Sequence, residues 1–217
     1  MLFRSGGKLF RSVRIANAIE AAPECAQRDR FMALAESHSL RPYLAIGRGY
    51  QGELAIRRGD ARNGVASLRG CLKDLHVARY EVLSTAFYIP LIQGLAAIDR
   101  VSEAITLVNE VIRRVKANGE LTYLPELLRL KGGLLLSIPQ PGAGDAEQYF
   151  IHSLELSRRQ GALAWELRTA IDLAALLAAQ GQIEGARAFL QPVFKQFKEG
   201  FDTVDLTAAQ RLLAALS

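Results

Sequence analysis

The amino-acid sequence predicts an all-α fold, a right-handed superhelical solenoid of about four helical hairpins closed by a C-terminal capping helix. Half of the 217 residues are hydrophobic but only 7% are aromatic, a leucine- and alanine-rich composition that favours helix packing over a β-sandwich. Small and apolar residues recur at helical spacing, as at Ala146, Phe150, Ser153 and Leu154. The same layout returns about every 40 residues, which is typical of stacked helical hairpins.

The period can be read from two sets of equivalent positions, each with nearly constant spacing. The first set is expected to face the partner helix of each hairpin: Gly52, Ile92, Gly132 and Ala174. The second set lies on the return helices: Leu68, Val108, Phe150 and Leu190. A match over four cycles predicts one continuous repeat domain over residues 41–217.

Residues 1–40 are predicted to form a poorly defined N-terminal helix or a worn repeat. The segment 1–19 carries Arg4, Lys8, Arg11 and Arg14 and no acidic side chain, as a basic amphipathic or transit-type segment would. We interpret this stretch as a worn or truncated terminal repeat or a disordered end, since chain ends are often disordered. A helix is expected around Arg28–Ser37.

Proline and glycine mark the first two hairpins. Pro42 suits a first helical turn, where its missing N–H costs nothing, and the Gly59–Asp60 pair indicates a turn. The expected helices of these hairpins are 42–58, a return helix containing Leu68 and Cys71, a helix from about Glu81, and a return helix between Asp99–Arg100 and Asn118–Gly119. Pro90 either kinks the third of these helices or marks its start.

The last two hairpins follow the same pattern. The expected helices begin at Pro125, run over 145–159 after a long turn at 138–144, and continue over 164–180 and 182–198, with a bend at Pro192. Trp165 is interpreted as a packing anchor between repeats, because tryptophan buries a large area. Gly200 ends the last hairpin, and Asp202 or Thr203 caps a final helix, 204–216, that would cover the open end of the stack.

Two groups of segments carry a family resemblance. The chain contains GDARNGVASLRGCL and DRVSEAITLVNEVI, which resemble tetratricopeptide repeats with long connections. It also contains ELLRLKGGLLL, AEQYFIHSLELSRRQGALAWELRTAIDLAALL and FKEGFDTVDL, which resemble the C-terminal repeat region of bacterial multidomain transcriptional regulators and adenylate-cyclase-type ATPases. The resemblance covers roughly residues 40–216 and implies a role in signalling or transcription regulation. No ATPase loop, cyclase motif or DNA-reading helix is seen, so those activities are not expected here.

No catalytic, cofactor-binding or metal-binding residues are predicted. His38, His76 and His152 lack ligand spacing, and four helical glutamates are interpreted as solvent-facing rather than as acid–base pairs: Glu53, Glu81, Glu126 and Glu166. Cys25 and Cys71 are expected to be free thiols in a reducing, cytoplasmic compartment. The net charge of +5 is spread along the chain and no apolar run reaches about 20 residues, so neither nucleic-acid nor membrane binding is expected.

The candidate site is a groove lined by the outgoing helix of each hairpin, as in other helical repeat stacks. Its predicted partner-binding residues are Glu53, Ile56, Arg57, Ile89, Gln93, Glu126, Arg129, Arg168 and Ile171. Between them the same faces carry Ile46, Gly49, Ala86, Ala96, Gly133, Leu136, Ala175 and Ala178. A mostly apolar groove with scattered charges suits a partner helix or an apolar extended peptide.

The expected function is therefore a non-catalytic protein- or peptide-binding scaffold or sensor module with an unidentified partner. Two alternatives stay open on the sequence alone. One is a structural unit that forms homodimers through exposed apolar faces. The other is a small-ligand sensor domain that holds an effector between the outgoing helices.

Overall fold

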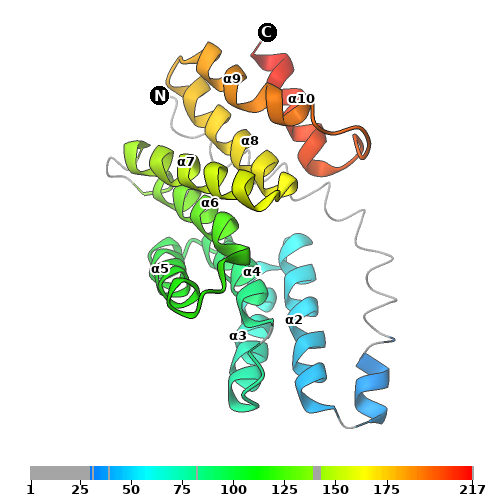
Figure 1. Cartoon of the computed structure of the whole chain (residues 1–217). Coiled ribbons are helices and arrows are strands. Elements are labelled where there is room, and N and C mark those ends of the chain that lie inside the picture. Colours follow the sequence, from blue (N-terminus) through cyan, green and yellow to red (C-terminus); the bar gives the residue numbers. More distant parts are fainter. Residues whose placement is uncertain (1–29, 31, 39, 82, 139–142, 217) are drawn as a thin grey trace. The chain divides into compact units, whose positions relative to one another are not determined.

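The computed structural model describes residues 30, 32–38, 40–81, 83–138 and 143–216, and in these ranges every regular element is a helix (Figure 1). In chain order the helices are α2 (Arg41–Arg57), α3 (Ala61–Val77), α4 (Ser84–Ala97), α5 (Val101–Asn118), the short 3-10 helix η1 (Leu121–Tyr123), α6 (Leu124–Leu135), α7 (Ala143–Gln160), α8 (Leu163–Ala179), α9 (Ile183–Phe194) and α10 (Val204–Ala215). The predicted all-α class is confirmed, whereas the handedness and the number of repeats remain predictions.

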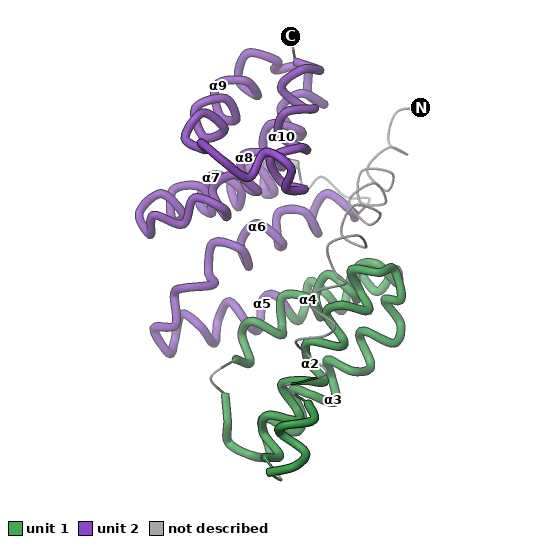
Figure 2. The backbone as a smooth tube through the Cα atoms, turned by 90° about the vertical axis from the view of Figure 1, so that its right-hand side faces the viewer, with its two compact units in different colours: residues 1–107 green, residues 108–217 purple. Residues whose placement is uncertain are grey.

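The chain divides into two compact units, residues 1–107 and 108–217 (Figure 2). Helices α2, α3 and α4 belong to the first unit, and α6 to α10 belong to the second, while α5 has residues in both. Within each unit consecutive helices pack against each other, and contacts also join every second helix: α2 with α4, α6 with α8, and α8 with α10.

A left-handed backbone residue recurs in the turns that follow successive helices. Positive φ angles occur at Gly59, Arg79, Asp99, Gly119, Gly161, Gly181 and Gly200. Glycine adopts this conformation without steric cost and ends helices readily, and aspartate tolerates it better than most residues. These turns separate successive helices of the chain.

In the first unit, helices α2 and α3 approach closely because two glycines face each other. A Cβ atom on Gly52 would lie 2.8 Å from the carbonyl oxygen of Gly64, and one on Gly64 would lie 2.6 Å from that of Gly52. Three residues earlier in α2, a Cβ on Gly49 would lie only 2.6 Å from the Phe87 ring and 2.8 Å from the Cys71 sulfur. The predicted interface position Gly52 thus faces the partner helix of its hairpin.

The core of the second unit is one continuous cluster contributed by α7, α8, α9 and α10. Phe150, Leu173 and Leu190 are fully buried in it, together with Leu206 and Ala209 of α10. Gly132 brings α6 against α7, since a Cβ there would lie 2.7 Å from the Phe150 ring. Helix α10 therefore packs on α8 and α9, as expected of a helix that covers the last hairpin.

Several predicted boundaries need adjustment. Pro90 lies inside α4 and does not start it, and α9 ends at Phe194 rather than at Lys198. Pro192 lies inside α9, which continues through it to Phe194 although proline cannot donate a backbone hydrogen bond to the preceding turn. The predicted helix at 28–37 is helical at Arg30 and 32–37, whereas the interpretation of residues 1–19 lies outside the described residues.

Candidate functional site

The predicted groove residues of the second unit lie on α6 and α8, the first helices of two successive hairpins. These helices contact each other, and α8 also contacts α10, which follows it as the next such helix. We call α6, α8 and α10 the outgoing helices of this unit. Residues three, four and seven positions apart share a helix face, so each outgoing helix carries one row of such residues.

Glu126 and Arg129 form the buried part of an ion-pair network on these helices. Arg129 Nε donates to Glu126 Oε2 at 2.8 Å, and its Nη2 donates to Glu126 Oε1 at 2.7 Å, a bidentate pair on α6. Its Nη1 donates to Asp172 Oδ2 on α8 at 2.5 Å. The side chains of Glu126 and Arg129 are 3% and 14% exposed, whereas that of Asp172 is 35% exposed.

A second pair joins α8 to α10 and lies close enough for Asp205 to act on the pKa of Asp172. Arg168 Nε on α8 donates to Asp205 Oδ2 at 2.6 Å, and the two side chains are 42% and 35% exposed. Asp205 lies in the first turn of α10, where a carboxylate interacts favourably with the helix dipole. We refer to these five residues, Glu126, Arg129, Arg168, Asp172 and Asp205, as the ion-pair network.

The network changes the pKa values of two of its members. Burial raises the pKa of Asp172, and Glu126 and Asp205 raise it further, so that Arg129 does not restore the usual value. Burial acts to lower the pKa of Arg129, but the carboxylates of Glu126 and Asp172 outweigh it and raise the pKa well above the ordinary value. Arg129 is therefore always charged, and the pKa of Asp172 stays above its ordinary value although Arg129 pairs with it.

Apolar and small side chains continue the face beyond the network. At the end of α6, Leu136 is 41% exposed. The space beside Gly133 is open, because a Cβ atom on this residue would have no neighbouring atom within 4 Å. On α8, Ile171, Ala175 and Ala178 are half-buried, and Ile171 and Ala178 pack against the core cluster on one side. The predicted groove residues of this unit thus form a charged part and an apolar part of one face.

In the first unit, the predicted groove residues lie on α2 and α4. Arg57 Nη2 donates to Glu53 Oε1 at 2.6 Å, an exposed pair one helical turn apart on α2. Ile56 is half-buried and faces two glycines, Gly64 on α3 and Gly94 on α4. A Cβ atom on either glycine would lie only 2.5 or 2.6 Å from the Ile56 side chain. Ile89 and Gln93 are half-buried on α4, a helix that contacts α2. Ile56 therefore contributes to packing between helices.

Two of the glutamates predicted to be solvent-facing are buried, so that prediction is wrong for them. Glu126 is 3% exposed and Glu166 is 6% exposed. Each is buried because an arginine reaches it: Arg129 on the same helix, and Arg158 of α7, whose Nε donates to Glu166 Oε1 at 2.7 Å. The other two glutamates, Glu53 and Glu81, keep partly exposed side chains.

Asp172 and Asp205 are the network members that the sequence analysis did not single out. Asp172 lies four residues after Arg168 on the same helix, and Asp205 lies in the first turn of the expected final helix. Helical spacing could have placed Asp172 near the groove, but the contact of Arg168 with Asp205 depends on how α8 and α10 cross.

No protein-family model matches the chain, and no curated protein matches it. The resemblance to tetratricopeptide repeats of bacterial regulators therefore rests on the residues quoted for it.

Trp165 lies at the start of α8 and packs against the preceding hairpin. Its ring is half-buried, and the ring centroids of Trp165 and Tyr123 are 5.7 Å apart at a tilted angle. Nearby, Ser153 donates to the carbonyl of Pro125 at 2.7 Å and also hydrogen-bonds Thr169 at 2.9 Å, so polar atoms tie α6, α7 and α8 together inside the core. Trp165 contacts the residue before α6, as a packing anchor between hairpins would.

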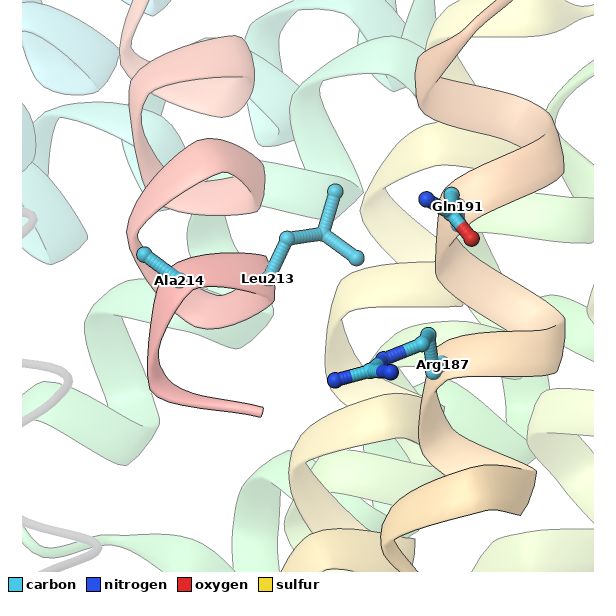
Figure 3. A pocket seen from close by; sticks show the side chains of 4 residues that line it. All are labelled: Arg187, Gln191, Leu213 and Ala214. Carbon is cyan, nitrogen blue, oxygen red and sulfur yellow. The ribbon is translucent and has the colours of Figure 1, made fainter. Parts of the chain in front are cut away.

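An open hollow of about 500 Å³ lies between α9 and α10 (Figure 3). Arg187 and Gln191 line it from α9, and Leu213 and Ala214 line it from α10. The guanidinium of Arg187 points toward α10 and donates to the carbonyl of Leu216, the C-cap residue of that helix. Lysine and arginine side chains commonly satisfy the last carbonyls of a helix, so Arg187 holds the end of α10 against α9.

Cys71 is a free, fully buried thiol, and burial raises its pKa to about 11. The prediction for Cys25 lies outside the described residues. Among the described residues, no three His, Cys, Asp or Glu side chains are grouped so that they could hold a metal ion. Within the same residues, no helix combines the length and apolar character needed to cross a bilayer.

Proposed function

We propose that this chain is a non-catalytic module that binds a protein or peptide segment on its outgoing helices. The observation that carries this proposal is the face of the outgoing helices, where α6 and α8 present an apolar part beside the ion-pair network, to which α10 contributes Asp205. Helix-in-groove recognition uses such surfaces, with apolar anchors for affinity and a few polar groups for orientation.

The chemistry of the face favours binding over catalysis. Glu126 and Arg129 hold each other in a bidentate pair, and Arg168 pairs with Asp205. A general acid or base needs an accessible group within reach of a substrate, and Glu126 is almost completely buried. In keeping with its resemblance to repeat regions of bacterial multidomain regulators, we propose a role in signalling or transcription regulation.

A peptide-library selection tests this function. The full chain is immobilised, random peptides long enough for about four helical turns are selected on it, and the affinities of the enriched peptides are measured in solution. Ala175→Arg places a large cation in the apolar part of the face, and Ala188→Arg makes the same change on the exposed side of α9. We expect Ala175→Arg to abolish binding of most enriched peptides and Ala188→Arg to leave it unchanged.

Light scattering and circular dichroism accompany the affinity measurements. They separate a blocked face from an unfolded or self-associated protein, because a homodimer formed through this face would also respond to Ala175→Arg. Failure to enrich any peptide, or equal loss of binding in both variants, would refute the proposed use of the outgoing helices.

A further inference from the structure

We propose that the segment bound by the second unit is amphipathic and carries a lysine or arginine that pairs with Asp172 and Asp205. This inference rests on the proposed function, because it names the chemistry of the partner for the same face. Its apolar side chains would cover the part of the face that includes Leu136, Ala175 and Ala178.

The charges of the network are unequal in number. Three carboxylates, those of Glu126, Asp172 and Asp205, stand against the two guanidinium groups of Arg129 and Arg168. One negative charge is therefore left without a matching cation within the network. Opposite charge within about 4–6 Å stabilises a partly buried carboxylate, so a partner cation has more to gain here than a partner anion.

Exposure decides where that cation can bind. Glu126 is 3% exposed and already accepts both bonds of a bidentate pair, so it is out of reach. Asp172 and Asp205 are each 35% exposed, on neighbouring helices. Each accepts a hydrogen bond from an arginine through Oδ2, Asp172 from Arg129 and Asp205 from Arg168, so the Oδ1 atom of each carboxylate takes no part in these pairs.

The raised pKa of Asp172 also favours a partner with a positive charge at this position. Burial is its main cause, and the neighbouring carboxylates of Glu126 and Asp205 add to it. An additional cation beside Asp172 would lower that pKa and stabilise the ionised carboxylate, whereas an anion would raise it further.

The apolar part of the face explains why the partner is expected to be an amphipathic segment and not a free cation. Leu136 is one of the large hydrophobic side chains left exposed, and the space beside Gly133 is open to a partner side chain. Ala175 and Ala178 are small and half-buried on α8, so a segment can approach the backbone of this helix closely. Apolar contact supplies most of the affinity, and the ion pair fixes the direction of the bound segment.

The probes are the peptides selected on the full chain. We measure their dissociation constants for the unmodified protein, Asp205→Asn and Asp172→Asn, with Glu155→Gln on an exposed site of α7 as a charge-matched control. Each peptide is also prepared with its basic residue replaced by norleucine. Asp205→Asn is the principal variant because its pair with Arg168 is partly exposed. Asp172→Asn removes the charge of the second carboxylate but keeps a side-chain oxygen that can accept from Arg129. Circular dichroism confirms the fold of every variant.

The expected result has three parts. The enriched peptides contain lysine or arginine beside apolar residues, Asp205→Asn weakens their binding about tenfold, and Glu155→Gln changes it less than twofold. The norleucine peptide binds the unmodified protein and Asp205→Asn equally well, which identifies a direct coupling between the two groups.

The two proposals fail in different ways. Enriched peptides that are blocked by Ala175→Arg but unaffected by Asp205→Asn and Asp172→Asn would overturn the charge complementarity and leave the proposed binding function intact. Selection of acidic or uncharged peptides would have the same consequence. Failure to select any peptide would refute both.

Discussion

Gly132 and Gly133 are adjacent on α6, yet alanine is expected to affect stability in opposite directions at the two positions. In a helix interior, alanine is more favourable than glycine by about 1 kcal/mol. At Gly132 the new Cβ would lie 2.7 Å from Cε1 of Phe150 and 3.1 Å from the carbonyl oxygen of Ala146, and Phe150 is fully buried. At Gly133 the same atom would meet nothing within 4 Å.

The magnitude follows from these distances. Overpacking a tight core costs about 1–3 kcal/mol, and a fixed backbone oxygen on α7 places Gly132→Ala in the upper part of that range. Gly132→Ala should therefore lower the free energy of unfolding by about 1–2 kcal/mol after the helix-propensity gain is subtracted. Gly133→Ala should raise it by about 1 kcal/mol.

Urea unfolding followed by tryptophan fluorescence measures both variants. Trp165 is the single tryptophan of the sequence and lies in the second unit, so its emission reports unfolding around α6 to α8. Equal stability of the two variants, or a stabilised Gly132→Ala, would show that α6 does not present Gly132 to α7 and Gly133 to the open face. The assignment of the binding face would then be wrong as well.

Three further predictions concern Arg129, Asp172 and Cys71. Arg129→Ala should lower the free energy of unfolding by about 3–5 kcal/mol, because it leaves the carboxylate of Glu126 buried without its arginine. Arg57→Ala removes an exposed ion pair and should lower it by less than about 1 kcal/mol. Urea titration of both variants measures the difference. The pKa of Asp172 is raised in the folded state, so its contribution to stability is fully present below the unfolded pKa and is lost as pH rises through the folded pKa. The free energy of unfolding of the unmodified protein, compared with that of Asp172→Asn, should therefore increase as pH falls from 7 toward about 4. A difference that does not change with pH would contradict the raised pKa. Cys71 is buried and its pKa is raised to about 11, so it should react slowly with a thiol reagent at pH 8. In a variant whose other cysteine is replaced by serine, labelling should occur only after unfolding in urea. Rapid labelling of the folded variant would contradict the burial of Cys71.

The sequence predicted the helices well because their limits depend on local signals. Glycine follows α2, α5, α7 and α8 at the left-handed position, and helical spacing placed the fully buried residues on the correct faces. The end of α9 was predicted less well: the helix passes through Pro192 and ends two residues later, at Phe194. The positive φ angle of Arg79 could not be predicted from the sequence, because arginine rarely adopts the left-handed conformation.

The candidate site was harder to predict because periodicity identifies a face but not how closely the next helix approaches it. Glu126 and Arg168 were assigned to the groove as independent charges, and the contacts that bury the first and pair the second come from other residues. Arg129 and Asp172 are separated by 43 residues, Arg168 and Asp205 by 37, so each pair joins two helices about one repeat apart.

That separation suggests how such networks can be sought in other helical repeat sequences. In a stack with a period of about 40 residues, outgoing helices of neighbouring hairpins lie side by side, so opposite charges one period apart on the same face are candidates for a pair. Arg69 and Glu103, 34 residues apart in the first unit, follow the same principle on a pair of return helices. In a repeat sequence, opposite charges about one period apart therefore indicate which helices pair. If such an ion pair is to be kept, both of its positions must change together.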